Sequence, residues 1–109
     1  LAKLQNPSVT TEKFNLKILQ LRIYFEKNYI DQAESTVDSF RHIIQNDKVL
    51  PESYKESHKN FYYFYLKLLS QKKKNERSVI SDLKEKLNST ANIICKKWLK
   101  EKIKEADEQ

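Results

Sequence analysis

The chain has 109 residues, a formal net charge of +6 at pH 7, no glycine, two prolines and one cysteine. A chain of this length forms one domain at most, and the lack of glycine argues against phosphate-binding glycine loops and dinucleotide-binding turns. The single cysteine excludes an intrachain disulfide and a zinc site built from several cysteines.

The first predicted helix begins at a cap on Thr10 or Thr11 and runs to about Lys27. Its apolar residues fall on two opposite faces. One face carries Phe14, Ile18, Leu21 and Phe25, and the other carries Leu16, Leu19 and Ile23. Because a helix that is apolar on two sides is usually packed on two sides, we predict an inner helix.

A turn at Asn28 and Tyr29 leads to the second predicted helix, from about Asp31 to Gln45. This helix has one apolar stripe, made of Ile30, Ala33, Val37, Phe40 and Ile44. Its other side is polar and includes His42, so we expect that face to lie in water.

The third predicted helix starts after Pro51, where proline is well tolerated, and runs from about Glu52 to Gln71. It contains five consecutive aromatic residues, from Phe61 to Tyr65. Successive rings on a helix point in different directions, so they cannot form a row of base-stacking platforms. We therefore expect most of them to form core, with Tyr63 alone on the polar side of the helix.

Residues 72–75, three lysines and an asparagine, are predicted to form a solvated linker. A fourth helix is expected from about Arg77 to Asn88, with Val79, Ile80, Leu83 and Leu87 on its apolar side. After a break at residues 89–92, a last helix is expected to reach about Glu105. Its predicted apolar side carries Ile94, Cys95, Trp98 and Leu99.

The helical periodicity extends over almost the whole sequence, and it predicts an all-α fold of about five helices without strands. Short connections favour antiparallel neighbours. We therefore predict a single domain over residues 1–109, with a first hairpin at 10–45, a second at 51–88 and a terminal capping helix at 90–105. Because the first residue is Leu1 rather than Met, we also expect the chain to be a piece of a longer protein.

Tyr24, Asn28 and Ala33 are spaced as in the tetratricopeptide pattern of Tyr, three residues, Gly, four residues and Ala. The first hairpin resembles that family, which implies a right-handed array of helical hairpins; the alternative is an unrelated small helical bundle. The sequence departs from the family pattern at Lys17, Gln20 and Leu21. The ending from Trp98 to Ile103 is similar to the closing helix of some large, uncharacterised bacterial repeat proteins.

No group of residues in the sequence has the pattern of a catalytic or metal site. Neither His42 nor His58 has an acidic residue or a second histidine three or four positions later. Cys95 is predicted to lie on an apolar helix face, as a structural thiol does. We therefore expect no enzyme activity, no cofactor and no metal.

The resemblance implies a non-catalytic scaffold that presents a groove to a peptide or protein partner. If the first and third helices line that groove, the polar residues between their apolar stripes should contact the partner. These are Asn15, Arg22, Glu26, Lys59, Tyr63 and Lys67. Their basic members suit an acidic partner, and an exposed tyrosine is a favoured interface anchor.

The alternative hypothesis is a small basic domain that binds nucleic acid non-specifically. Residues 71–109 carry a net charge of +4, which would attract phosphates in a salt-dependent way. No apolar run approaches the ~18 residues of a membrane span, so we expect a soluble, cytoplasmic protein without membrane contacts. A homodimer through the exposed flank of the first helix is a further expectation.

Overall fold

The computed structural model describes the backbone of residues 7–74 and 76–108, and the side chains of residues 12–74 and 76–108. These described residues form five helices: α1 (Pro7–Glu26), α2 (Ile30–Asn46), α3 (Glu52–Lys74), α4 (Arg77–Asn88) and α5 (Lys96–Asp107). The described residues contain no strand, which confirms the predicted all-α fold. The helices form two compact units, residues 1–50 with α1 and α2, and residues 51–109 with α3, α4 and α5.

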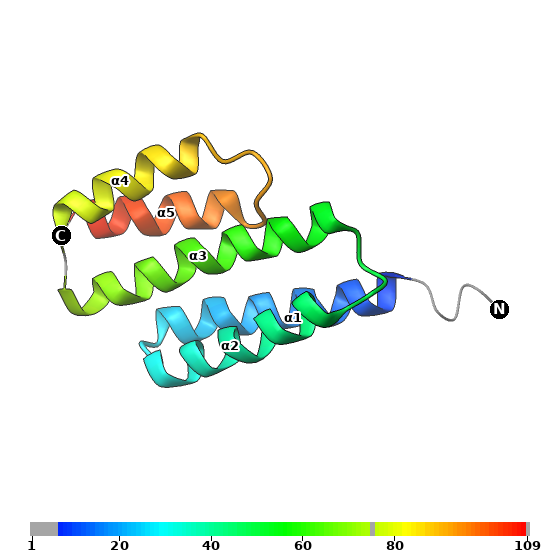
Figure 1. The fold of residues 1–109 in the computed structure, drawn as a ribbon. Helices are drawn as coiled ribbons and strands as arrows, with labels where there is room; N and C mark the ends of the chain where they lie inside the picture. Colours follow the sequence, from blue (N-terminus) through cyan, green and yellow to red (C-terminus); the bar gives the residue numbers. More distant parts are fainter. Residues whose placement is uncertain (1–6, 75, 109) are drawn as a thin grey trace. The chain divides into compact units, whose positions relative to one another are not determined.

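The first unit is an antiparallel hairpin of α1 and α2 (Figure 1). Helix α1 begins at Pro7, so the predicted cap at Thr10 or Thr11 is wrong: both threonines lie inside the helix. The early start has a physical reason, because proline at the first helical position lacks only an N–H that would have no intrahelical partner. The predicted core stripe of α1 is buried, and the ring of Phe14 packs edge-on against Phe40 of α2 at 5.3 Å between centroids.

The turn between α1 and α2 depends on Asn28, whose φ of 61° lies in the left-handed region. Asparagine tolerates this conformation better than most residues other than glycine. The amide of Tyr29 donates to the carbonyl of Tyr24 at 2.9 Å, which closes the end of α1. Ala33 in α2 is fully buried, so its small side chain lets the two helices approach closely.

The second apolar stripe of α1 is exposed, and the prediction of an inner helix packed on two sides is wrong. Leu16, Leu19 and Ile23 are 68 %, 50 % and 46 % exposed. Within this unit α1 has a single partner helix, α2, which covers only the face that carries Phe14.

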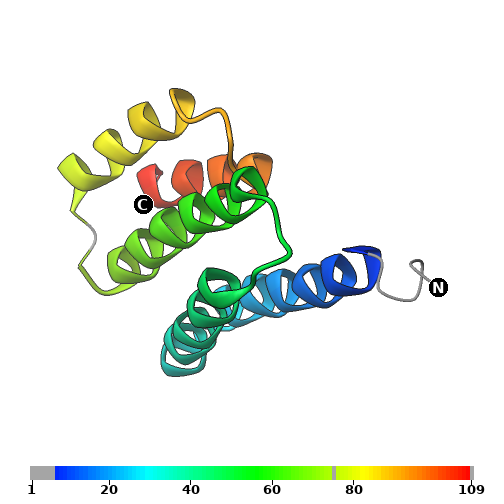
Figure 2. The same cartoon turned by 45° about the vertical axis from the view of Figure 1, so that its right-hand side comes forward.

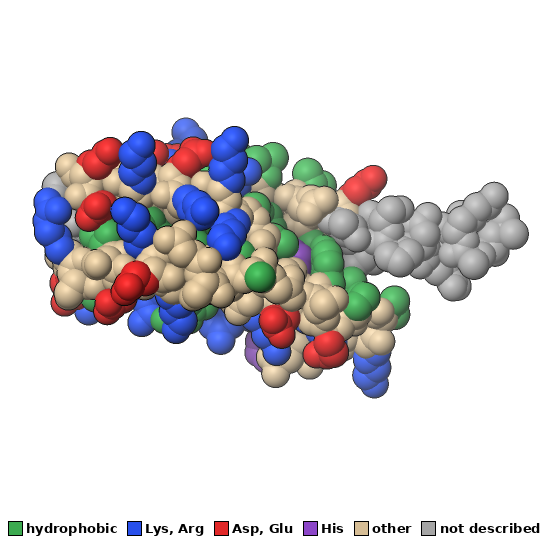
Figure 3. Space-filling view, turned by 90° about the horizontal axis from the view of Figure 1, so that it is seen from above, with side chains coloured by type: hydrophobic (Ala, Val, Ile, Leu, Met, Phe, Trp, Pro, Cys, Tyr) green, Lys and Arg blue, Asp and Glu red, His purple; other side chains and the backbone are tan. Residues whose placement is uncertain are grey.

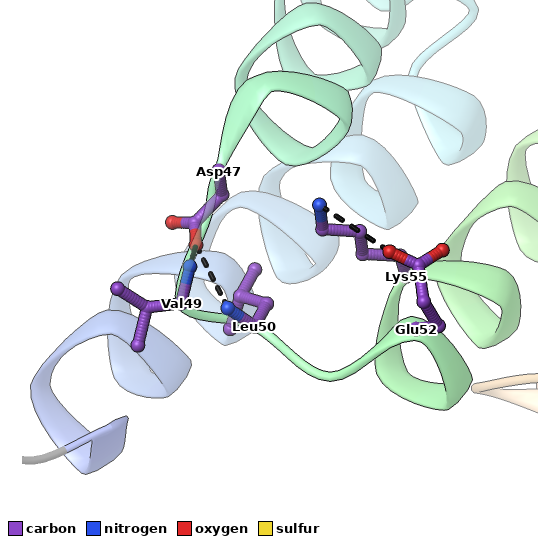
Figure 4. Close-up of polar contacts among 5 residues, drawn as sticks. All are labelled: Asp47, Val49, Leu50, Glu52 and Lys55. Atoms are coloured by element: carbon purple, nitrogen blue, oxygen red, sulfur yellow. Dashed lines mark hydrogen bonds and ion pairs between the residues drawn. The ribbon is translucent and has the colours of Figure 1, made fainter.

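Asp47 organises the chain as it leaves α2. Its carboxylate accepts hydrogen bonds from the amides of Val49 at 2.7 Å and Leu50 at 2.9 Å, as Figure 4 shows. This local turn is one that aspartate favours, because the side chain replaces the backbone acceptors that a continuing helix would supply.

The second unit begins with α3, which is longer than predicted. The lysines at 72–74 form its last turn, so the prediction of a linker there is wrong, although all three side chains are solvent-exposed. Lysine is a good helix former, and cations are favoured at the negative end of a helix. In the first turn of α3, the ammonium of Lys55 lies 3.8 Å from the carboxylate of Glu52 (Figure 4).

Helix α5 lies along both α3 and α4, and the three helices share one core (Figure 2). The ring of Trp98 stacks on Tyr65 at 6.2 Å and lies 6.3 Å from Phe61. The other apolar side chains that are nearly or fully buried in this unit are Tyr62, Phe64, Leu68, Leu69, Ile80, Leu83, Leu87, Leu99 and Ile103.

The connection between α4 and α5 is longer than predicted, because α5 begins at Lys96. Ile94 and Cys95 precede the helix instead of belonging to its apolar side, and Cys95 has a left-handed φ of 55°. The segment is attached to α3 by backbone groups: the amide of Ile94 donates to the carbonyl of Ser57 at 3.3 Å. The side chain of Asn92 also donates to the carbonyl of Ser53 at 2.9 Å.

Candidate functional site

The aromatic run of α3 divides into a buried majority and one exposed ring. Phe61, Tyr62, Phe64 and Tyr65 are at most 2 % exposed, whereas Tyr63 is 40 % exposed. This confirms the predicted orientation of the run. Tyr63 is therefore the one member of the run that a partner could reach from solvent.

Two lysines surround the ring of Tyr63. The ammonium of Lys86, from α4, lies 4.5 Å from the ring centroid and donates a hydrogen bond to the phenolic oxygen at 3.2 Å. The ammonium of Lys67, one turn further along α3, lies 5.6 Å from the same centroid. Both distances are within the range of cation–π attraction, so the ring is held in a positively charged setting.

Tyr63 lines a hollow of about 300 Å³ between α3 and α4. We call this hollow the Tyr63 site, and its lining residues are Tyr63, Lys67, Val79, Asp82, Leu83 and Lys86. It combines an aromatic ring face, two ammonium groups, one carboxylate and the aliphatic side chains of Val79 and Leu83. Such a surface can bind a peptide carboxylate or a carbonyl group beside an apolar side chain.

The six residues predicted to contact a partner are divided between the two units. Asn15 and Glu26 on α1 are exposed and Arg22 is half-buried, and their spacing places them on one face of the helix. On α3, the structure brings Tyr63 and Lys67 together. Lys59 is exposed one turn before Tyr63, outside the lining of the hollow.

Helix α4 contributes two polar residues to the Tyr63 site that were not predicted from the sequence. Asp82 and Lys86 are four residues apart and so lie on one face of that helix. The residue pattern of α4 predicted only its apolar side. Asp82 and Lys86 follow Val79 by three and seven residues, and this spacing was the signal in the sequence for a polar face on α4. The spacing could not show that this face lies next to α3.

Burial in α3 favours the neutral forms of His58 and Tyr62. His58 is 1 % exposed, and burial lowers its pKa to about 4 from an ordinary value of 6.5. Burial also raises the pKa of Tyr62, and the neighbouring Tyr54 adds to the rise. His42 is exposed on α2, as predicted. Neither histidine adjoins the Tyr63 site.

Cys95 is half-buried rather than part of an apolar helix face. Within the described part of the chain, no three His, Cys, Asp or Glu side chains are grouped as metal ligands would be. None of the described helices combines the length and the apolar character that crossing a lipid bilayer requires.

Comparison of the chain with protein-family models, with curated proteins and with solved structures found no match.

Proposed function

We propose that the chain is a non-catalytic protein-interaction module that binds a peptide or protein partner through the Tyr63 site. The observation that carries this proposal is the exposed ring of Tyr63, fixed between the ammonium groups of Lys67 and Lys86 at the edge of a hollow. Tyrosine is among the residues that contribute most to binding at interfaces, above all where its ring is already held in place.

An acidic partner suits this site. Lys67 and Lys86 give the site two positive charges, and Asp82 provides one negative charge. Lys59 adds a further exposed ammonium group on the same face of α3. Excess positive charge steers acidic partners and disfavours basic ones, so it contributes to the rate and specificity of association.

The interpretation of the first hairpin as tetratricopeptide-like is part of the same proposal. Asn28 is left-handed and Ala33 is fully buried, so the turn residue and the small packing residue of the family pattern are compatible with the geometry at those two positions. Under this interpretation, the first unit has a second contact face on α1, which consists of Asn15, Arg22 and Glu26.

The proposal is tested by affinity capture from a lysate with quantitative mass spectrometry. The variants are Tyr63→Ala and, as a matched control, Tyr29→Ala, because Tyr29 is 46 % exposed but lies outside the hollow. We expect Tyr63→Ala to reduce capture of the partner about tenfold or more, in line with the loss of an interface anchor. Tyr29→Ala should leave capture unchanged.

A double variant, Arg22→Ala with Tyr63→Ala, tests both predicted contact faces together. If it still captures every protein that the unmodified chain captures, the assignment of the partner site is wrong. Circular dichroism of each variant confirms that a loss of capture does not come from unfolding.

A further inference from the structure

A second hollow, of about 370 Å³, lies between α4 and α5. We call it the lysine groove, and its lining residues are Lys84, Leu87, Asn88, Lys100, Ile103, Lys104, Asp107 and Glu108. The Tyr63 site lies on the α3 side of α4, and the two hollows share no lining residue. The space-filling view in Figure 3 shows Lys and Arg side chains in blue among the red carboxylates of the face turned to the viewer.

The antiparallel arrangement of α4 and α5 brings three lysines to this groove. Arg77 at the start of α4 donates to the backbone carbonyl of Asp107 at the end of α5, at 3.1 Å, which fixes the alignment of the two helices. Lys100 and Lys104 are one turn apart on α5 and so lie on the same face. Lys84 of α4 lines the same groove from the opposite side.

The positive charge of these lysines is not neutralised within the described residues. None of Lys84, Lys100 and Lys104 forms an ion pair there. Of the two acidic residues in the lining, Asp107 is engaged, because its carboxylate lies 4.0 Å from the guanidinium of Arg77. The lining therefore carries more positive than negative charge and attracts an anionic group, whereas Glu108 near the end of α5 adds a negative charge.

The base of the groove is apolar. Leu87 and Ile103 form its floor and are 1 % and 2 % exposed, so an inserted side chain would contact only the small part of each that faces the groove. Lysine stems also present methylene groups to such a floor while their ammonium groups remain in water. A ligand that fits must combine negative charge with a small apolar group.

We propose that the lysine groove binds an acidic peptide segment that inserts one aliphatic side chain between α4 and α5. This inference rests on the proposed function in one respect, that the partner is a protein, but its site is separate from the Tyr63 site. A nucleic acid fits less well, because its phosphates are spaced continuously along the strand and would meet Glu108 at one end of the groove. Its backbone also offers no aliphatic group to the floor.

The test uses the full chain and a fluorescently labelled peptide in which glutamates flank a central leucine. Titration of the peptide is compared for the unmodified chain and the variant Lys84→Gln/Lys100→Gln/Lys104→Gln. We expect the variant to bind about tenfold more weakly or worse, with the difference shrinking as salt screens the charges. Replacing the central leucine of the peptide by serine should also weaken binding several-fold, because the apolar contact is lost.

The matched control is Lys13→Gln/Lys48→Gln/Lys97→Gln, which removes the same charge from three exposed lysines outside both hollows. It should bind the peptide nearly as well as the unmodified chain. Equal weakening by both triple variants would overturn the proposal, because the attraction would then depend only on net charge. The proposal would also be overturned if the chain bound a single-stranded oligonucleotide more tightly than the peptide and the variant Lys84→Gln/Lys100→Gln/Lys104→Gln lost that binding.

Methyl chemical shifts separate this proposal from the proposed function. Addition of the peptide should shift the methyl signals of Leu87 and Ile103 and leave those of Val79, in the Tyr63 site, unchanged. Shifts at Val79 alone would refute the lysine groove and leave the proposed function standing. Loss of capture by Tyr63→Ala has no bearing on the peptide titration, so either claim can fail without the other.

Discussion

His58 is the residue whose environment has the clearest consequence for stability. Its ring is buried in α3 beside Tyr54, with ring centroids 4.5 Å apart, and its pKa is lowered to about 4 by burial. In the unfolded chain its pKa returns to the ordinary value of 6.5. Between these two values the unfolded chain binds a proton that the folded chain does not, so stability falls as the pH falls.

We therefore predict that the free energy of unfolding declines between about pH 6.5 and pH 4, with roughly 3 kcal/mol of the loss due to His58. Urea unfolding at a series of pH values measures this decline. In His58→Gln the decline should be smaller by that amount, because glutamine does not titrate. The exposed His42 is the control, and His42→Gln should keep the full decline; an unchanged pH dependence in His58→Gln would contradict the assignment.

At the scale of the helix, α1 offers a matched pair of leucines. Leu21 is fully buried and Leu19 is 50 % exposed, two positions apart on the same element. We predict that Leu21→Ala lowers the free energy of unfolding by about 3 kcal/mol, because it leaves a cavity. Leu19→Ala should cost less than about 0.5 kcal/mol, as exposed substitutions usually do.

Urea unfolding followed by far-UV circular dichroism compares the two variants under one condition. The substitution is chemically the same in both, so intrinsic helix propensity cancels from the comparison. A similar loss in both variants would mean that the stripe of Leu16, Leu19 and Ile23 is covered in solution. That result would restore the two-sided packing that the sequence pattern suggested.

The helices were largely predictable from the sequence, whereas some of their ends were not. Helical periodicity located all five helices, and it placed Tyr63 opposite the buried rings because helix geometry fixes the direction of each side chain. It could not predict that the lysines at 72–74 continue α3, since a polar run is equally compatible with a helix end and a loop. The left-handed conformation of Cys95, which delays α5, has no signal in the residue type.

The Tyr63 site was predictable only in part, because spacing in the sequence relates residues of one helix but not residues of two helices. Tyr63 and Lys67 lie on one helix, so their spacing predicts that they are neighbours. Lys86 reaches Tyr63 from a different helix, and such a contact depends on how α3 and α4 pack. The lysine groove likewise joins residues of α4 and α5 that no spacing rule relates.

At the scale of the molecule, two compact units carry different surfaces. The first unit offers the polar face of Asn15, Arg22 and Glu26. The second offers the Tyr63 site and the lysine groove on the two sides of α4. This distribution suits a chain that binds partners through several surfaces, and we propose the Tyr63 site as the main one.

Site-specific photo-crosslinking in living cells tests that claim most directly. A benzophenone amino acid is placed at Tyr63 in one variant and at the equally exposed Tyr29 in another. We predict a discrete adduct from position 63 that protease removes and nuclease does not, with no such adduct from position 29. Adducts of equal yield at both positions, no adduct at position 63, or an adduct that nuclease removes would contradict it.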